Sequence, residues 1–276
     1  MTSAIVVDTT ISGSMVDTVP NHPLLLVADA HVRPDTSVEA EFREMLAWVS
    51  TTDYDIAFLG DVLELWIGLK RYSTALSSEF LEWCSSEKAR RRVLFVEGNH
   101  EFFVVRHHGD CFTESSKDEL PLGEVVLVHG DTAQDLPSHR RFRRWSKSWL
   151  MHFFVHWAPF APAFVRRLKR NFERKSAMRE HRYPSADVEH WGAECLAHYP
   201  QAKRLVLGHF HCQQEHLLPD GRQITVLPAW KDAYQVGVLN PANSELVIQN
   251  WRDLTAGPET RSHGQVPDVP VVPDVP

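Results

Sequence analysis

The chain has no Lys or Arg before Arg33 and no apolar run long enough to cross a bilayer. Because a signal peptide begins with a basic region and a membrane span needs about 20 apolar residues, we expect neither. Cysteine is scarce: Cys84, Cys111, Cys195 and Cys212 stand far apart, without the spacings of structural zinc or redox sites. We therefore expect free thiols in a reducing cytosol.

Composition favours one globular domain with loose ends. Of 276 residues, 43% are hydrophobic and 24% charged, which is ordinary for a protein with a sizeable core. Residues 1–21 lack a hydrophobic period, and residues 254–276 are rich in proline and end in VPDVPVVPDVP. We expect both ends to be disordered around a domain at 22–253, although the tail could also serve as a docking peptide.

Five short apolar runs each lead into Asp, Asn or His. They are Leu24–Ala28, Ile56–Leu59, Val93–Val96, Val125–Val128 and Leu205–Leu207. A buried strand followed by such a side chain places it at the carboxyl end of the strand, where open α/β sheets carry their chemistry. Five runs of this kind predict one shared site.

The strand ends offer seven side chains of metal-ligand type: Asp29, His31, Asp61, Asn99, His129, His209 and His211. Carboxylates, an amide and imidazoles without a thiolate suit Mn²⁺, Fe²⁺ or Zn²⁺. Seven ligands are too many for one tetrahedral ion and suit two ions that share a carboxylate. Since residues two apart on an extended segment point to one face, Asp29 and His31 should point together, as should His209 and His211. Scattered structural histidines are the alternative.

The motif order D-x-H, G-D-x-x-E, G-N-H-E, H-G-D and G-H-x-H resembles that of the calcineurin-like metallophosphoesterases. This resemblance implies a dinuclear centre, with Mn²⁺ the favoured metal and Fe²⁺ or Zn²⁺ possible. It implies a first metal at Asp29, His31 and His211, a second at Asn99, His129 and His209, and a bridge by Asp61. Asp61, Asn99 and His100 would be catalytic, with His100 directed at the scissile phosphate.

Strand and helix alternate along the middle of the chain. Ser37–Ser50 and Thr74–Ala89 carry apolar residues at helical spacing. After His211 four short strands are expected, at Gln213–Leu218, Gln223–Leu227, Tyr234–Leu239 and Glu245–Trp251. The predicted fold class is α/β (α+β): two sheets packed face to face with helices outside. The resembled family implies the same four-layer α/β/β/α sandwich.

Residues 133–199 separate the His-Gly-Asp motif from the Gly-His-x-His motif, and we expect them to form a helical cap outside the sandwich. From Arg140 to Arg182 there are thirteen basic residues against Glu173 and Glu180, a balance of +11. The remaining sixteen basic and thirty-four acidic residues leave −18. This asymmetry indicates an anionic partner at the cap.

Aromatic residues recur at helical spacing within this basic segment. The two stripes are Phe142, Trp145, Trp149 and Phe153, then Phe160, Phe164, Leu168 and Phe172, and Pro159 and Pro162 are expected to break the first helix. Basic amphipathic helices of this kind suit an anionic membrane surface or an acyl chain. Simple packing of the stripes on the core is the alternative. Nucleic acid is not expected, because no base-reading module is visible.

The segment GDVLELWIG at residues 60–68, above all Trp66-Ile67, is similar to the signature of the UDP-2,3-diacylglucosamine hydrolases of lipid A biosynthesis. That resemblance implies a nucleotide-linked glycolipid substrate, cleaved to UMP and 2,3-diacylglucosamine 1-phosphate at the inner membrane face. Two features depart from this branch: His100 replaces its usual Arg, and only Asp135 stands where it has two acids. Candidate substrate contacts are Arg140, Arg144, Ser176, Arg179 and Arg182.

Two other classes stay open from the sequence. One is a soluble metallophosphodiesterase or phosphatase that acts on a nucleotide or phosphoprotein, in which the insertion is only structural. The other is a non-enzymatic scaffold, although a scaffold needs no set of intact ligands. We expect a cytoplasmic protein, peripheral on the inner membrane face, without an obligate protein partner.

Overall fold

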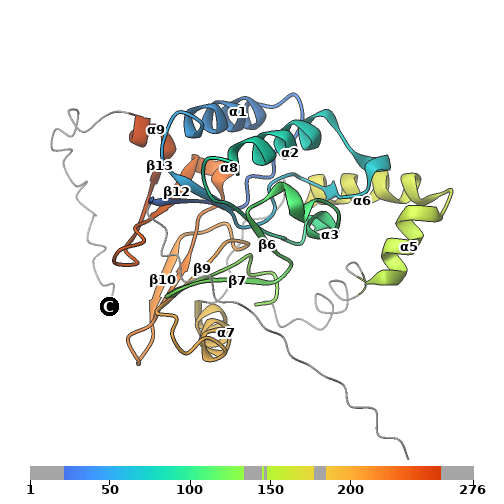
Figure 1. Ribbon diagram of the computed structural model, residues 1–276. Coiled ribbons are helices and arrows are strands. Elements are labelled where there is room, and N and C mark those ends of the chain that lie inside the picture. Colours follow the sequence, from blue (N-terminus) through green and yellow to red (C-terminus); the bar gives the residue numbers. More distant parts are fainter. Residues whose placement is uncertain (1–21, 134–144, 146–147, 177–184, 256–276) are drawn as a thin grey trace, which may run out of the picture.

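The computed structural model describes residues 22–133, 145, 148–176 and 185–255, and two β-sheets form its centre (Figure 1). One sheet has the strand order β13-β12-β1-β2-β4-β6 and the other β10-β11-β9-β8-β7. The first contains β1 (Leu24–Val27), β2 (Asp55–Phe58), β4 (Val93–Val96), β6 (Glu114–Ser116), β12 (Gln235–Leu239) and β13 (Leu246–Asn250). The second contains β7 (Glu119–Leu122), β8 (Val125–Val128), β9 (Arg204–Leu207), β10 (Gln214–Leu217) and β11 (Gln223–Val226).

The strands that lead to the ligand motifs run side by side. β1 pairs in parallel with β2 and β2 with β4, while β8 pairs in parallel with β9 in the second sheet. All residues of β1, β2, β4 and β8 are buried, as expected for strands covered on both faces. Because parallel strands end at the same edge, the motifs that follow them meet there.

Alternation along the strands divides the core into layers. Leu24 and Leu26 of β1 face the second sheet, where they join Leu127 and Val206 in the core between the sheets. The intervening Leu25 and Val27 point to the opposite, helix-covered face. This period of two is the expected signature of a strand buried on both sides.

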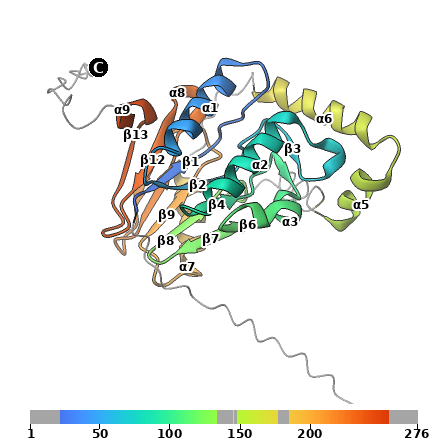
Figure 2. The ribbon, with the colours of Figure 1, turned by 45° about the horizontal axis from the view of Figure 1, so that its top comes forward.

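Helices α1 (Ser37–Val49) and α2 (Ala75–Glu87) cover the outer face of the six-stranded sheet (Figures 1 and 2). At their starts, the Thr36 and Thr74 side chains accept hydrogen bonds from backbone N–H groups of the first turn. The short helices α8 (Trp230–Ala233) and α9 (Trp251–Thr255) contribute buried tryptophans to the same layer. The two helices predicted from spacing are confirmed to within two residues at each end.

Helix α7 (Ser185–Ala197) covers the outer face of the five-stranded sheet and completes the predicted four layers. Val188 and Leu196 pack there against Val126 and Leu205. The expectation that all of residues 133–199 lies outside the sandwich is therefore wrong for α7. The physical reason is that β8 and β9 are parallel neighbours, and such a crossover is normally completed by a helix packed on the sheet.

Helices α5 (Trp149–Trp157) and α6 (Ala161–Ser176) stand at one side of the sandwich, and we call them the cap (Figure 2). Met151 and Val155 of α5 are buried against Ile67 and Phe103 of the core. Those core residues belong to or adjoin elements that spacing did not predict: β3 (Trp66–Ile67), β5 (Glu101–Phe102) and α3 (Val104–His108), with the turns η1 (Lys70–Tyr72) and η2 (Gly109–Cys111).

Side chains of the core also bind backbone carbonyls at the carboxyl end of α5. Arg71 donates a hydrogen bond to the carbonyl of His156 at 2.7 Å, and the Tyr72 hydroxyl donates to that of Val155 at 2.9 Å. The cap is thus attached by polar as well as apolar contacts. Over the described ranges, no helix has both the length and the apolar character needed to traverse a membrane.

Candidate metal centre

All seven predicted ligands lie in loops at one edge of the two sheets. Asp29 and His31 follow β1, Asp61 follows β2, Asn99 follows β4, and the remaining three, His129, His209 and His211, follow β8 and β9. The structure brings all seven side chains together. Their role as ligands stays a prediction, and the geometry below shows what they could hold.

The first group contains Asp29, His31 and His211, whose ligand atoms all lie within 4.8 Å of one another. The Nε2 atoms of His31 and His211 are 3.1 Å apart, and His211 Nε2 is 3.4 Å from Asp29 Oδ1. Asp29 Oδ1 is buried and accepts no hydrogen bond. A buried carboxylate oxygen in that state is costly unless a cation compensates it, so the group fits a divalent ion.

The second group contains Asn99, His129 and His209. His129 Nε2 lies 3.2 Å from Asn99 Oδ1 and 3.3 Å from His209 Nδ1. The other nitrogen of His129, Nδ1, lies 2.8 Å from the carbonyl of Leu59. Because a carbonyl only accepts, Nδ1 carries the proton, and the Nε2 lone pair faces the group as a metal ligand requires.

Asp61 lies between the two groups. Its Oδ2 atom is 3.7 Å from His31 Nε2 and 3.5 Å from His129 Nε2. Its Oδ1 atom accepts a hydrogen bond from the backbone N–H of His100 at 2.8 Å, which fixes the carboxylate plane. One oxygen therefore faces both groups, as a bridging ligand would.

The backbone at these loops is left-handed. Five of the seven residues have φ between 42° and 69°: Asp29, His31, Asp61, His209 and His211. Residues other than glycine rarely adopt this conformation, and it is typical of functional sites. The extended geometry expected for the D-x-H and H-x-H pairs is therefore wrong. Neighbouring loops impose the turns instead, because Asp29 N–H bonds the carbonyl of Gly60 and His31 N–H that of Asp61.

The carboxylates favour their ionised forms. Burial alone would raise the pKa of Asp29, but the adjacent imidazoles, led by His211, outweigh it and lower the pKa to about 2. Burial likewise opposes ionisation of Asp61, yet His100 and His129 hold its pKa well below the usual value. Two buried carboxylates that stay ionised suit a site for cations.

The pKa values of His129 and His209 are shifted in opposite directions. Burial disfavours a charged His129, but Asp61 outweighs burial and raises its pKa to about 10. Burial and the neighbouring His129 together lower the pKa of His209 to about 3. A metal ion bound at Nε2 of His129 would displace the second proton that Asp61 otherwise favours on this imidazole.

Glu101 is a site residue whose role the sequence reasoning missed. Its carboxylate accepts hydrogen bonds at 2.8 Å from the backbone N–H groups of Asp61, Val62 and Gly98. It is fully buried, and burial together with the charge of Asp61 raises its pKa to about 8. Glu101 therefore ties the loop after β2 to the loop after β4. A charged residue directly behind the G-N-H motif was the available signal.

His100 is buried, and its Nδ1 lies 2.6 Å from the carbonyl of Glu64. Its Nε2 is thereby directed at the centre, 3.8 Å from Asp61 Oδ2. Phe172 of α6 stacks on the imidazole, with ring centroids 4.3 Å apart. His31, Asp61 and His100 also lie close enough to hold an ion, so the geometry permits His100 as a further ligand.

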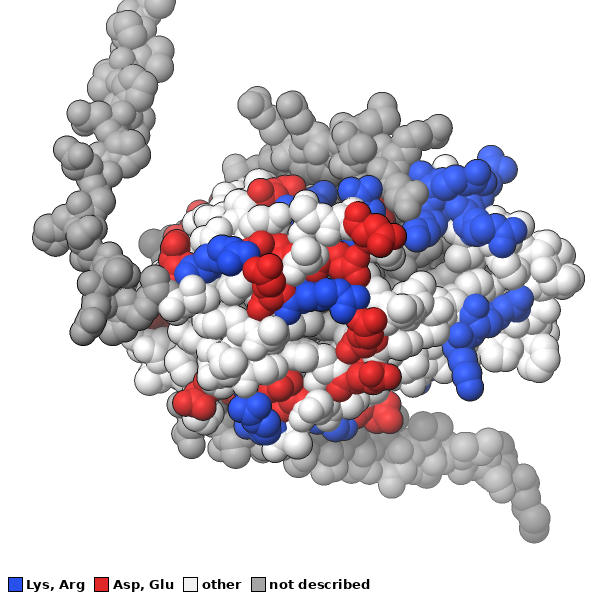
Figure 3. Space-filling view, turned by 90° about the horizontal axis from the view of Figure 1, so that it is seen from above, with Lys and Arg blue, Asp and Glu red and all other residues white. Residues whose placement is uncertain are grey.

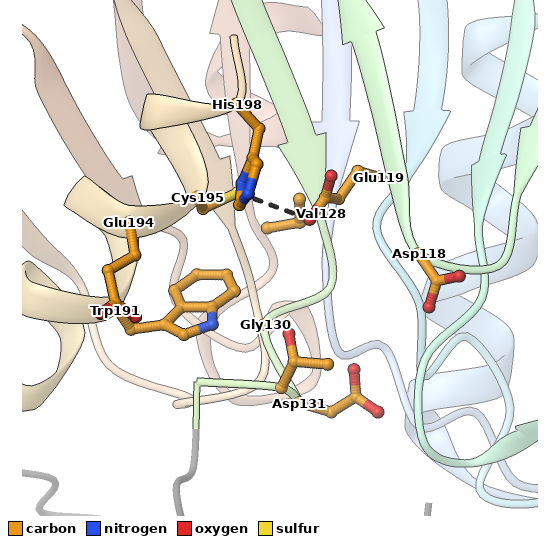
Figure 4. A pocket seen from close by; sticks show the side chains of 10 residues that line it. Asp118, Glu119, Val128, Gly130, Asp131, Trp191, Glu194, Cys195 and His198 are labelled. Carbon is orange, nitrogen blue, oxygen red and sulfur yellow. Dashed lines mark hydrogen bonds between the residues drawn. The ribbon is translucent and has the colours of Figure 1, made fainter. Parts of the chain in front are cut away.

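A cavity of about 320 Å³ opens beside the loop that follows His129 (Figure 4). Gly130 and Asp131 line one side of it, and Trp191 and Cys195 of α7 line another, with the Cys195 thiol donating to Glu119. None of the seven predicted ligands lines it. This cavity is therefore distinct from the metal centre.

The predicted substrate contacts cannot be assigned from the geometry. Arg140, Arg144, Arg179 and Arg182 lie outside the described residues. Ser176 ends helix α6, but its side chain is not among those described. These five residues stay predictions.

Comparison with known proteins agrees with the geometry. The family model described as calcineurin-like phosphoesterase matches residues 22–213. A protein of Shewanella loihica named UDP-2,3-diacylglucosamine hydrolase is 26% identical over 231 residues, which cover 80% of this chain and 94% of the relative. A protein of the same name from Actinobacillus succinogenes is 26% identical over 235 residues, covering 80% and 97%.

Solved structures give weaker matches. A novel archaeal phosphodiesterase is 10% identical, covers 82% of this chain and 98% of its own, and has a TM-score of 0.43. A dimetal phosphatase from Danio rerio is 14% identical, covers 83% and 96%, and has the same score. With scores below 0.5, the assignment rests on the family model and the sequence relatives.

Proposed function

Because the chain belongs to the calcineurin-like phosphoesterase family, whose members depend on two metal ions, we propose that it hydrolyses UDP-2,3-diacylglucosamine. The products are UMP and 2,3-diacylglucosamine 1-phosphate, an intermediate of lipid A biosynthesis. Metal-dependent phosphoester hydrolysis follows from the family itself. The lipid substrate and Mn²⁺ as the metal are the proposed part, supported by the names of the relatives and by the cap.

The observation that carries this proposal is the contact between the cap and the centre. Phe172 of α6 stacks on His100, which directly follows the predicted ligand Asn99. The cap is therefore part of the wall of the site. A substrate bound at the centre would meet its basic and aromatic side chains, and this suits an anionic, acylated molecule.

The chemistry divides between the metals and the protein. Two divalent ions held by the seven predicted ligands would polarise phosphoryl oxygens and lower the pKa of a water molecule toward neutrality. The carbonyl of Glu64 holds the imidazole of His100, whose Nε2 faces the centre and can stabilise charge developing on the phosphate. Glu101 fixes the two loops that present Asp61 and Asn99, which keeps the ligands in place through the reaction.

We assign the attack to the phosphorus next to uridine. If the acyl chains lie between the cap and the core, the sugar phosphate leaves toward the cap and the nucleotide phosphorus lies over the ligands. The departing sugar phosphate is a stabilised dianion that needs little protonation. This polarity of cleavage is also what the resemblance to the lipid A branch implies.

The exposed face of the cap suits a membrane surface. Among the described residues, six of the eight exposed large apolar side chains lie between 145 and 160, namely Trp145, Trp149, Leu150, Phe153, Trp157 and Phe160. Basic residues of α6 add positive charge, and on the face drawn in Figure 3 Lys and Arg gather at the cap side of the molecule. Apolar and cationic side chains together favour anionic lipid, so we place the enzyme in the cytoplasm, peripheral on the inner membrane face.

Mass spectrometry of products tests the substrate. Purified protein with Mn²⁺ and UDP-2,3-diacylglucosamine in ¹⁸O-labelled water should give labelled UMP and unlabelled lipid phosphate. Label in the sugar phosphate would show attack at the other phosphorus, and inorganic phosphate would exclude this substrate class. Cleavage confined to soluble phosphodiesters or phosphoproteins in a detergent-free screen would favour the soluble alternative. No hydrolysis of any phosphoester would favour a scaffold.

A further inference from the structure

Close contacts between imidazole nitrogens mark the metal centre, and one more lies outside it. At the centre, such contacts join His31 to His211 at 3.1 Å and His209 to His129 at 3.3 Å. Away from it, Nε2 of His107 lies 2.9 Å from Nε2 of His152. Among the described residues these are the three His–His contacts of this length. The third pair therefore has the arrangement that the two predicted metal groups share.

The outlying pair joins the core to the cap. His107 belongs to α3 and His152 to α5, and their rings lie 5.1 Å apart and nearly parallel. His156 lies one turn further along α5, with its ring 5.9 Å from that of His152. Two histidines four residues apart on one helix face are a common chelating arrangement.

From this geometry we infer that His107, His152 and His156 form a third metal site, specific for a transition metal such as Zn²⁺ or Ni²⁺. Imidazole ligands without carboxylate or thiolate suit these metals and disfavour Mg²⁺ or Ca²⁺. The site is independent of the proposed function, since it shares no residue with the metal centre. Bound metal would join α3 to α5 and hold the cap against the core.

In the observed positions the ligand nitrogens of the three histidines are not all within 4.8 Å of one another, so His156 has to turn toward the pair before an ion can bind. Tetrahedral zinc with bonds of about 2.0–2.1 Å separates two ligand nitrogens by about 3.3 Å, close to the observed 2.9 Å. His156 is exposed and can rotate toward the pair without disturbing the core. His107 is exposed as well, and Phe103 packs edge-on against His152, which limits the ring orientations of that residue.

The surroundings of this site have two opposing effects on metal binding. Burial, and then the charge of Arg106, lower the pKa of both His107 and His152, which keeps the rings in the neutral form that binds metal. The charge of Arg106 also repels a cation. The expected affinity is therefore lower than at the centre, where Asp29 and Asp61 contribute negative charge.

Zinc stoichiometry tests the inference. The wild-type protein, His107→Ala, His152→Ala and a control, His190→Ala, are dialysed against micromolar Zn²⁺, and bound zinc is counted by mass spectrometry. His190 is an exposed histidine of α7, far from α5 in the chain. His107→Ala and His152→Ala should each bind one ion fewer than the wild type, and the control His190→Ala should bind the same number. Because the difference carries the test, it holds even if the proposed dinuclear centre is wrong.

Hydrogen exchange of α5 provides a second measurement. Zn²⁺ should slow amide exchange across α5 in the wild type and in His190→Ala, but not in His107→Ala or His152→Ala. Equal zinc counts in all four proteins would overturn the inference. So would a difference that appears only at millimolar Zn²⁺, or zinc protection of α5 that persists without His107.

Discussion

Phe172 of the cap stacks on His100 of the G-N-H motif, with ring centroids 4.3 Å apart and ring planes inclined by 28°. On another side, the His31 ring meets the imidazole edge-on at 4.6 Å. His100 is thus held between a predicted metal ligand and a cap residue. The position of α6 and the orientation of this imidazole are therefore coupled, and the coupling can be tested through Phe172.

Replacing Phe172 by Ala should lower kcat about 2- to 10-fold, because a ring pair of this kind is worth roughly 0.5–1.5 kcal/mol. Initial rates on a generic phosphodiester measure the effect without the lipid substrate. Phe172→Tyr should restore kcat and the pH profile of kcat, since it keeps the ring. Phe164→Ala is the control, because Phe164 packs within the cap against Phe154. Equal losses in both alanine variants would reduce Phe172 to general cap packing.

His100→Ala should retain both metals while kcat falls by roughly 10²–10⁴-fold, the usual effect of removing one general acid or base. Metal content by mass spectrometry and kcat are measured on the same preparation. Loss of an ion together with activity would instead identify His100 as a ligand, which its distance of 3.8 Å from Asp61 Oδ2 permits.

Asp61→Ala should be the most damaging single substitution, because its Oδ2 faces both ligand groups. We expect at most one ion per chain and a fall in kcat at least as large as that of His100→Ala. Asp53→Ala, at an exposed position, should change neither quantity. Fully active wild-type enzyme with one ion per chain would contradict the dinuclear assignment.

Glu101→Ala should destabilise the protein and weaken metal binding, because three buried backbone N–H groups lose their acceptor. Each such group costs about 1–3 kcal/mol when left unsatisfied. Thermal unfolding with and without Mn²⁺ measures both effects. Glu101→Gln keeps one amide oxygen as an acceptor and should lose less. An unchanged Tm for Glu101→Ala would show that the loops after β2 and β4 hold without this carboxylate.

Binding to vesicles of anionic lipid should depend on the exposed face of the cap. Trp149 and Trp157 are 70% and 68% exposed, so replacing both by Ser should weaken binding without affecting folding. Replacing Arg166, Arg167, Lys169 and Arg170 by Gln should remove the salt-sensitive part, which acts over about 8 Å at physiological ionic strength. Sedimentation with vesicles measures both. Unchanged binding and lipid hydrolysis in both variants would exclude the membrane surface as a partner.

The sequence predicted the convergence of the seven ligands because each follows a buried apolar strand, and parallel strands end together. It did not predict the left-handed turns at Asp29 and His31, since these depend on hydrogen bonds between loops far apart in the chain. The role of Glu101 was missed for the same reason, because two of its three backbone donors lie about 40 residues earlier.

The helical segment between β8 and β9 shows a different limit. Its aromatic spacing predicted two helices with a break at the prolines. The second helix is confirmed as α6, which holds Pro162 in its first turn, and the first is confirmed only from Trp149 onward, because Phe142 lies outside the described residues and Trp145 precedes α5. The same reasoning did not predict the place of α7. Its apolar residues follow a helical period less clearly, and its packing on Val126 and Leu205 decides its layer. Periodicity identifies a helix, but only tertiary contact decides which layer it joins.

The position of the cap within one crossover has an evolutionary consequence. The chain leaves β8, forms α5 and α6, and returns through α7 to β9 beside it, so the sandwich needs only α7 to close. A lineage could lengthen, shorten or exchange the two cap helices while every predicted ligand kept its strand and register. Substrate preference could then evolve largely independently of the metal-dependent chemistry. The contact between Phe172 and His100 would still couple the two, because it joins a cap residue to a residue of the site.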